Sequence, residues 1–191
     1  MKPQIIALLG PSGAGKSTAI RELARDGSPF RYVQPYTTRA LRPGESEKIR
    51  VPLPRLLTLQ RQGQLLALQN VFGNSYGTPL RPIMQASAEG FLPIIDWPAS
   101  RLAELKARFP GHVTSVYLVP PSFQVLQRRL QDGRDPDGTR LRLALAELTA
   151  LERGDFQGLI DFFISTDGTP EIVAARAQDV LGHTFRTAQN R

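Results

Sequence analysis

Short runs of apolar residues alternate along the chain with longer stretches in which apolar side chains recur every three or four positions. The short runs predict buried strands at residues 4–9, 31–34, 91–96, 112–119 and 159–165. The longer stretches predict helices at residues 16–25, 53–62, 80–89, 100–109, 122–131, 140–153 and 170–181. Apolar strands separated by amphipathic helices favour a parallel sheet that is covered on both faces. We therefore expect an α/β fold of three layers.

Two segments interrupt this alternation. Residues 35–76 are rich in turn formers, with an extended segment expected at 64–72, and indicate a small lobe inserted into the core. Residues 132–139 are polar and rich in glycine and proline, which is typical of a mobile loop between two helices. We expect one domain over residues 1–191 that ends in a frayed basic tail at 186–191. The expected parts are a core at 1–34 and 87–191, a lobe at about 35–86 and a lid at about 131–140.

Composition excludes several kinds of chemistry. The chain has no cysteine, and His112 and His183 lie far apart in sequence, so we expect no disulfide framework, thiol nucleophile or Cys/His metal site. The net charge is +7, but the 20 arginines and 4 lysines are spread along the chain without aromatic platforms, so nucleic acid is not expected as a partner. No apolar run approaches the roughly 18 residues that cross a bilayer, and no signal peptide precedes the first strand. We expect a soluble, cytoplasmic protein that does not bind membranes.

One glycine-rich segment carries recognisable chemistry. Residues 10–17 match G-x-x-x-x-G-K-[ST], directly after a predicted strand and at the start of a predicted helix. Glycines let successive backbone N–H groups surround phosphate oxygens, and the helix N-terminus adds its positive dipole end. Lys16 can neutralise the β- and γ-phosphates, and Ser17 can ligate Mg²⁺. The sequence therefore predicts binding of ATP and Mg²⁺. The residues expected to contact the nucleotide are Gly10, Ser12, Gly13, Ala14, Gly15, Lys16, Ser17 and Thr18.

A second phosphate site is a weaker prediction. Arg39 and Arg42 stand three positions apart before a Pro-Gly turn, where two guanidinium groups can enclose one phosphate, although a solvated turn has the same spacing. Farther on, Tyr76 offers a hydroxyl next to a glycine. Arg134 and Arg140 lie in or beside the predicted lid, where arginines can stabilise a transferred phosphoryl group or simply face solvent.

Taken together and in order, seven segments resemble the guanylate kinase family. They are GPSGAGKST at 10–18, TTRALRPGE at 37–45, VFGNSYGT at 71–78, the strand that ends in Asp96, YLVPPS at 117–122, LQRRL at 126–130 and RLRLALAEL at 140–148. The resemblance implies a P-loop NTPase core, an inserted lobe that binds the phosphate acceptor, a mobile lid, and transfer of the ATP γ-phosphoryl group to GMP.

The resemblance also assigns roles to individual residues. Lys16 and Ser17 would serve ATP and Mg²⁺, and Lys16 would be catalytic. Asp96 would hold a Mg²⁺-bound water or polarise the acceptor. The lid arginines, Arg134 and Arg140, would reach the transferred phosphoryl group. The acceptor's phosphate would be bound by Arg39, Arg42 and Tyr76.

The chain departs from the family pattern where guanine is read. Pro35, Ala67 and Pro98 occupy the positions of a serine, a glutamate and an aspartate, and none offers a side-chain hydrogen bond. A base site that loses such partners loses selectivity. Three functions stay open: a kinase with GMP as nominal acceptor, a sugar-phosphate kinase of the ribose 1,5-bisphosphate phosphokinase type, and a catalytically silent binding module. Trp97 either lines the acceptor pocket or packs in the core.

Overall fold

The computed structural model describes residues 2–71, 73–131, 135 and 137–189. The chain forms two compact units. The first consists of Met1–Ile5 and Pro29–Ile95, and the second of Ile6–Ser28 and Asp96–Arg191. Each unit carries one set of the residues that the sequence singles out.

Five strands form one sheet in the order β2-β7-β1-β8-β9. They are β1 (Ile5–Leu9), β2 (Phe30–Tyr32), β7 (Leu92–Asp96), β8 (Val113–Val119) and β9 (Phe162–Ser165). In the first unit β2 pairs with β7 in parallel, and in the second unit β8 pairs with β9 in parallel. Every residue of β1 is buried, as the unbroken apolar run predicts for a central strand of a parallel sheet. The five strands predicted from the apolar runs are thereby confirmed.

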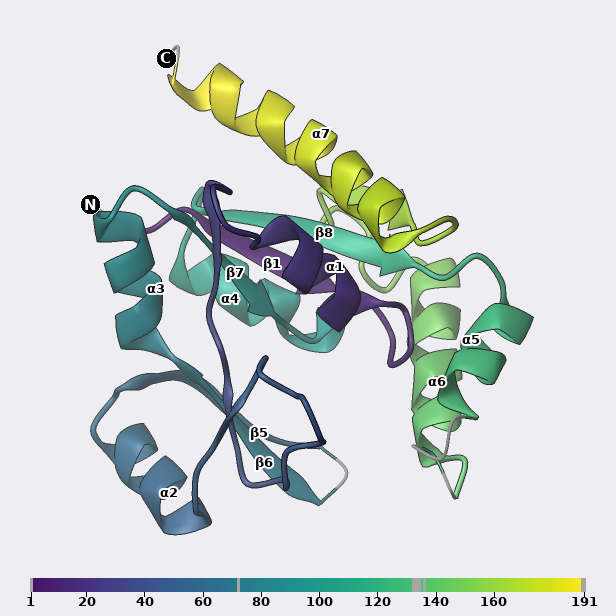
Figure 1. Cartoon of the computed structure of the whole chain (residues 1–191), viewed down its shortest axis with the longest axis horizontal. Coiled ribbons are helices and arrows are strands. Elements are labelled where there is room, and N and C mark those ends of the chain that lie inside the picture. Colours follow the sequence, from purple (N-terminus) through teal and green to yellow (C-terminus); the bar gives the residue numbers. More distant parts are fainter. Residues whose placement is uncertain (1, 72, 132–134, 136, 190–191) are drawn as a thin grey trace. The chain divides into compact units, whose positions relative to one another are not determined.

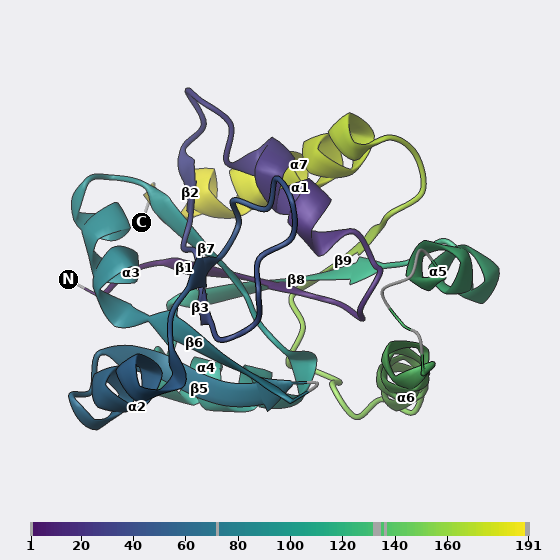
Figure 2. The same cartoon turned by 60° about the horizontal axis from the view of Figure 1, so that its bottom comes forward.

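Helices cover both faces of the strands in the second unit. They are α1 (Lys16–Leu23), a short 3₁₀ helix η1 (Ala99–Arg101), α4 (Leu102–Arg108), α5 (Phe123–Leu130), α6 (Thr139–Glu152) and α7 (Pro170–Gln189). α1 and α7 lie side by side on one face, and α4 lies on the other (Figure 2). α5 packs along α6 (Figure 1) through Leu126, Leu130 and Ala144. The predicted three-layer α/β architecture is confirmed.

The end of the chain differs from its prediction. The sequence predicts a helix that stops at residue 181 and a frayed tail from 186, whereas α7 continues to Gln189. After Gly182 no proline or glycine follows within the helix, so no local signal ends it there.

A smaller sheet of four strands builds the first unit, in the order β4-β3-β6-β5. Its elements are β3 (Tyr36–Thr37), β4 (Ile49–Arg50), β5 (Leu65–Val71) and β6 (Asn74–Pro79), with the helices α2 (Leu53–Arg61) and α3 (Leu80–Ala88). The sequence predicts α2, α3 and the extended segment of β5, but not the other three strands. Two-residue strands have no periodicity to detect, and β6 contains asparagine, glycine and proline, which strands avoid.

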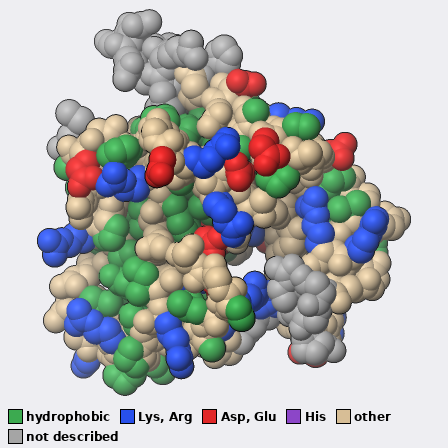
Figure 3. Space-filling model, in the orientation of Figure 1, with side chains coloured by type: hydrophobic (Ala, Val, Ile, Leu, Met, Phe, Trp, Pro, Cys, Tyr) green, Lys and Arg blue, Asp and Glu red, His purple; other side chains and the backbone are tan. Residues whose placement is uncertain are grey.

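The two faces of this small sheet differ in character. One face packs on α2 through Leu56, Leu59 and Leu65. Gly77 lies beneath this helix, where an added Cβ would meet a Leu56 methyl group at 2.8 Å. The outward surface around α2 shows basic and apolar side chains (Figure 3). The opposite face of the sheet includes Tyr76, and it is this face that carries the candidate acceptor site.

Candidate active site

The glycine-rich loop that joins β1 to α1 has the backbone that its sequence predicts. Gly10, Gly13 and Gly15 have φ values of +133°, +83° and +102°, which residues with a side chain rarely adopt. A Cβ on Gly10 would stand 2.7 Å from the carbonyl oxygen of Leu118, so there is no room for a side chain. α1 begins after Gly15 without a side-chain cap. The N–H groups of its first turn are therefore available to an anion.

Lys16 is folded back over this loop. Its ammonium group donates hydrogen bonds to the carbonyl oxygens of Gly10, at 2.6 Å, and Pro11, at 3.2 Å. Ser17 and Thr18 follow in the first turn of α1, and both are exposed. All eight residues predicted to contact the nucleotide thus lie in one loop and one helical turn.

α5 packs against the glycine-rich loop, a contact that the sequence does not reveal. A Cβ on Gly13 would meet the side chains of Leu126 and Leu130 at 3.1 Å, so the helix and the loop are in close contact. The Arg129 guanidinium donates to the carbonyl oxygens of Gly13 and Ala14, both at 3.4 Å. It also reaches the backbone oxygen and the hydroxyl of Thr166, both at 3.3 Å, and so ties α5 and the end of β9 to the loop. In the sequence, the only indication of this role for Arg129 is its place within the LQRRL segment at 126–130.

Asp96 and Trp97 lie at the carboxyl end of β7, where the sequence predicts Asp96 to stand. Asp96 is partly exposed, whereas Trp97 is only 3% exposed. The indole N–H of Trp97 donates to the carbonyl oxygen of Arg101 at 3.0 Å, and its backbone N–H donates to Leu8. Of the two roles open for Trp97, the structure supports packing in the core.

A buried acid–phenol pair connects α6 to the sheet. Tyr117, fully buried in β8, donates a hydrogen bond to Oε1 of Glu147 at 3.0 Å. Burial raises the pKa of the Tyr117 phenol, and the Glu147 charge adds to this effect. Burial also raises the pKa of Glu147, while the charge of Lys16 acts in the opposite direction and that of Asp96 in the same direction. Glu147 lies within the segment at 140–148, but its sequence context assigns it no role.

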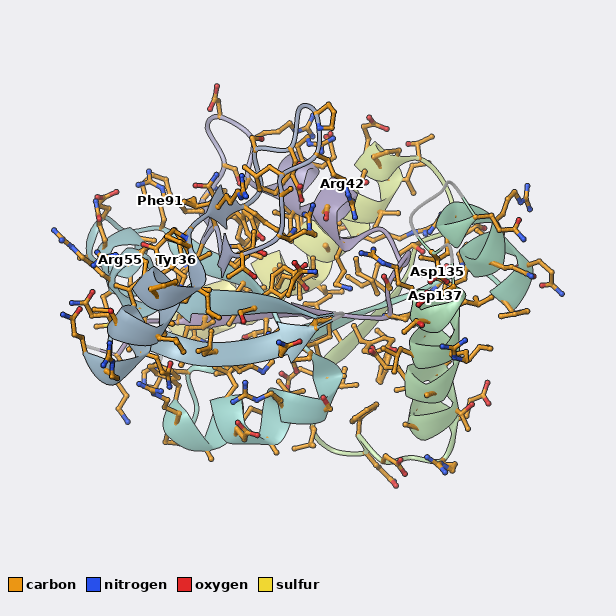
Figure 4. All side chains as sticks on the ribbon, turned by 90° about the horizontal axis from the view of Figure 1, so that it is seen from below. Tyr36, Arg42, Arg55, Phe91, Asp135 and Asp137 are labelled. Atoms are coloured by element: carbon orange, nitrogen blue, oxygen red, sulfur yellow. The ribbon has the colours of Figure 1, made fainter. Side chains whose placement is uncertain are left out.

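Two aspartates organise the start of α6 (Figure 4). The Asp135 carboxylate accepts hydrogen bonds from the backbone N–H groups of Arg140, at 2.8 Å, and Leu141, at 2.9 Å. Asp137 accepts one from Thr139 at 3.1 Å. Negative charge at a helix N-terminus is stabilising, so these contacts fix Arg140 as the second residue of the helix. Arg134, the other predicted lid arginine, lies outside the described residues.

In the first unit, Arg39 is held by Glu45, an acid to which the sequence pattern assigns no role. Its NH2 group donates to both carboxylate oxygens of Glu45, at 2.6 and 2.7 Å, and its NH1 group donates to the Ala40 carbonyl at 2.6 Å. The hydrogen bond with Glu45 raises the pKa of Arg39 against the effect of burial, and a side-chain hydrogen bond with Tyr76 adds to it. Arg39 and Tyr76 are therefore neighbours, as a shared phosphate site requires.

Glu45 also closes the turn that carries Arg42. Its backbone N–H donates to the Arg42 carbonyl, and the Arg42 N–H donates back to its carboxylate, both at 3.0 Å. Burial opposes ionisation of Glu45, but hydrogen bonds from Arg39 and Arg42 and the charge of Lys48 lower its pKa to about 2. The Arg42 side chain is exposed (Figure 4). Instead of two equivalent guanidinium groups open to one phosphate, the turn presents one that is already paired and one at the surface.

The neighbours of Tyr76 in the strand register are neutral side chains. In the strand register Gln69 lies opposite Tyr76 and Ala67 lies opposite Thr78. Thr37 also lies opposite Tyr76, from β3. Ala67, Thr78 and Thr37 are buried, and Gln69 is partly exposed. This part of the face therefore offers hydroxyl and amide groups but no carboxylate.

Other classes of site are not found in the described parts of the chain. No group of three or more His, Asp or Glu side chains is arranged to hold a metal ion among these residues. None of the helices described is both long and apolar enough to span a membrane. At the glycine-rich loop, the exposed Ser17 hydroxyl offers one oxygen ligand to a cation.

Comparison with known proteins assigns the family. The family model "Guanylate kinase" matches residues 2–174. A guanylate kinase of Gluconobacter oxydans is 35% identical over 153 residues, which cover 75% of this chain and 73% of that protein. One of Trichormus variabilis is 32% identical over 167 residues, which cover 84% and 83%. The crystal structure of guanylate kinase from Anaplasma phagocytophilum is similar at 25% identity and a TM-score of 0.74, over 95% of this chain and 86% of that one.

A sugar kinase structure from Janibacter, at 18% identity and a TM-score of 0.51, shares the fold. The family model, the curated relatives and the Anaplasma structure thus all point to guanylate kinases. This chain belongs to the guanylate kinase family and is a P-loop phosphotransferase of the nucleoside monophosphate kinase type.

Proposed function

We propose that this chain transfers the γ-phosphoryl group of ATP to the phosphate of a nucleoside monophosphate, and that it accepts GMP with little preference over other bases. The observation that carries the proposal is that Arg39, held by Glu45, lies beside Tyr76, whose described neighbours in the strand register carry no carboxylate. It combines an oriented cation for a phosphate dianion with hydroxyl and amide groups for the base.

The donor half of the reaction belongs to the glycine-rich loop and the start of α1. Bound Mg·ATP supplies the transferable phosphoryl group, with the cation neutralising part of its charge. The backbone N–H groups of the loop hold the phosphates, and Ser17 offers its exposed hydroxyl to the cation. Lys16 exchanges the carbonyl oxygens of Gly10 and Pro11 for phosphate oxygens, a rearrangement that involves only its side chain. Asp96, at the carboxyl end of β7, would hold a water bound to the cation.

The acceptor half belongs to Arg39, Tyr76 and Arg42. A phosphate dianion bound by Arg39 replaces the Ala40 carbonyl as hydrogen-bond acceptor, while Glu45 keeps the guanidinium in place. Tyr76 donates its hydroxyl to the same phosphate, and Arg42 reaches it from the surface. Arg140 and Arg134 stabilise the charge that spreads over the transferred group. Transfer requires the two phosphates to meet in line.

The side chains next to Tyr76 in the strand register offer the base neutral partners. Thr78 and Gln69 can each donate or accept, so different bases can form a hydrogen bond with them. A neutral hydrogen bond contributes about 0.5–1.5 kcal/mol, which corresponds to roughly tenfold discrimination or less. Pro35 and Pro98 add no polar side chain. The lack of polar side chains at Pro35, Ala67 and Pro98 also favours an acceptor without a base, so a sugar phosphate is the second candidate.

A single assay separates these functions. The protein is incubated with Mg·ATP and, in turn, GMP, AMP, CMP, UMP, dGMP and ribose 1,5-bisphosphate, and ADP release is measured. We expect kcat/KM values for several nucleotides within about 30-fold of one another, given the small hydrogen-bond differences. Exclusive use of GMP would contradict the argument from the neutral neighbours of Tyr76. Turnover of the sugar phosphate alone would establish the second candidate, and ATP binding without turnover would establish a silent module.

Arg39→Ala tests the acceptor site directly. We expect the acceptor KM to rise by at least tenfold and kcat to fall, with the KM for ATP nearly unchanged, because a charged hydrogen bond to the acceptor is lost. Arg31→Ala is the matched control, since Arg31 is an exposed arginine of the same unit that pairs with Glu89. An effect of Arg39→Ala that falls on ATP alone would refute the assignment.

A further inference from the structure

A long stretch of the first unit carries no acidic side chain. Residues 48–88 contain neither Asp nor Glu, so all 17 acids of the chain lie elsewhere. The same stretch contains five basic residues: Lys48, Arg50, Arg55, Arg61 and Arg81. Among the described residues, the lysine pairs with Glu45, and none of the four arginines forms an ion pair. The four arginines, all exposed, therefore leave a positive charge that no neighbouring carboxylate balances.

Two exposed leucines lie on one side of α2. Leu53 and Leu57 are 46% and 45% exposed, and their spacing of four residues places them one turn apart on the same side of the helix. Arg61 continues this line by one more turn. Its guanidinium donates to a neutral group, the Thr58 hydroxyl, at 3.4 Å. The helix thus presents a line of two apolar side chains and one cation to solvent.

The strand before the helix extends this surface. Ile49 is 41% exposed, and the exposed Arg50 follows it in β4. Val51 comes next and packs against the same core cluster as α2, so Arg50 lies near the start of the helix. On the face that Figure 3 shows, basic and apolar side chains but no acidic ones lie over α2. The α2 surface, as we name it, consists of Ile49, Arg50, Leu53, Leu57 and Arg61.

This composition favours one kind of partner. A second copy bound about a two-fold axis would place the same cations face to face. Nucleic-acid sites add aromatic side chains for stacking, and residues 48–71 contain none. A helix on a membrane buries its main apolar face in lipid, whereas α2 buries Leu56 and Leu59 in the protein. A protein segment that carries both carboxylates and apolar side chains complements the α2 surface in charge and in polarity.

We propose that the α2 surface binds an acidic amphipathic helix of a partner protein. Leu53 and Leu57 contact its apolar side, and Arg50 and Arg61 pair with its carboxylates. Stable complexes bury about 1,200–2,000 Å², more than one short helix and two strand residues offer, so the complex is transient. Because α2 covers the face of the small sheet opposite Tyr76, the bound helix leaves the candidate acceptor residues uncovered. The inference does not depend on which acceptor is phosphorylated.

A synthetic peptide serves as the probe for binding to the full chain. It has about 20 residues, with leucines at positions i, i+3, i+4 and i+7 of each repeat and glutamate or alanine elsewhere. We expect fluorescence anisotropy of the labelled peptide to give a Kd on the order of 10 µM at low salt. Binding should weaken at least fivefold between about 50 and 300 mM NaCl, because salt screens exposed charges. A peptide with glutamine in place of every glutamate should bind at least tenfold more weakly.

Two variants of the chain test which side of α2 is used. Leu57→Gln and Arg61→Gln should each raise the Kd at least fivefold. Arg55→Gln is the matched control, since it removes the same charge from the same helix. Arg55 stands two positions from both leucines and so lies about 200° around the helix axis from Leu53, and its loss should change the Kd less than about twofold. All three replaced side chains are exposed, so melting temperatures should agree with that of the natural chain.

Several results would overturn the proposal. Equal losses of affinity in Arg55→Gln and Arg61→Gln would mean attraction by overall charge, and an unchanged Kd in Leu57→Gln would mean that the apolar side chains take no part. Tighter binding to phosphatidylserine vesicles or to single-stranded RNA than to the peptide would assign the surface to lipid or nucleic acid. A dimer that Leu57→Gln dissociates would assign it to a second copy. None of these measurements uses turnover, so failure of the proposed kinase function would leave their outcome unaffected.

Discussion

The pairing of Glu45 with Arg39 makes a prediction whose size and pH dependence can be worked out. The pKa of Glu45 falls from 4.5 to about 2 on folding. At about 1.4 kcal/mol per pH unit, such a change stabilises the fold by about 3 kcal/mol at most. Both side chains keep some contact with solvent, 16% for Arg39 and 9% for Glu45, and solvent screens the pair. We therefore expect Glu45→Gln to lower the free energy of unfolding by about 1–2 kcal/mol at pH 7, or roughly 3–6 °C in Tm.

The sign of the pH dependence follows from the direction of the pKa change. Because the pKa of Glu45 is lower in the folded state, its contribution is complete above pH 4.5 and is lost as the pH falls toward 2. Denaturant unfolding at pH 7, 4 and 3 should thus show a difference between the natural chain and Glu45→Gln that shrinks in acid. Glu89→Gln, which removes an exposed carboxylate paired with Arg31, should change stability little. A difference that is the same at pH 7 and pH 3 would refute the reasoning.

Three further variants test other contacts. Gly10→Ala should reduce Mg·ATP affinity by at least tenfold in calorimetric titrations, because a backbone at positive φ and the close Leu118 carbonyl leave no room for a methyl group; unchanged affinity would mean that the loop can relax. Asp135→Ala should lower the free energy of unfolding by about 1 kcal/mol in denaturant titrations, since two N–H groups of α6 lose their acceptor; equal stability would mean that water caps the helix as well. In Asp161, burial opposes ionisation but hydrogen bonds from Ser115 and Lys106 lower the pKa below its usual 3.8. Asp161→Asn should therefore be less stable by about 1 kcal/mol above pH 4, and the deficit should disappear at lower pH; a deficit that persists in acid would point to packing instead.

The sequence predicts most of the elements because their patterns are local. The five apolar runs of the main sheet and the helices between them follow from periodicity over a few turns. The small sheet is predicted only in part, since β3 and β4 are two residues long and exist through pairing with distant segments. Hydrogen bonds between segments far apart leave no pattern in either segment alone.

The candidate site likewise has a part that local sequence predicts and a part that depends on contacts between side chains. The loop at residues 10–15 is recognisable in the sequence because its three glycines stand where the backbone adopts positive φ values. The spacing places Arg39 and Arg42 close together. It does not reveal that the Glu45 carboxylate binds the Arg39 guanidinium and accepts a hydrogen bond from the Arg42 backbone N–H. That outcome depends on side-chain packing, which spacing does not encode.

The chain's own sequence determined the nucleotide loop, the alternation of strands and helices, and the absence of polar side chains at Pro35, Ala67 and Pro98. Tertiary structure alone decided that Arg129 lies under a loop 116 residues away and that Glu147 pairs with a tyrosine 30 residues away. The reason is physical. Local conformation follows from short-range sterics and periodic burial, whereas charges and hydrogen-bonding groups find their partners only after the core has brought distant segments together.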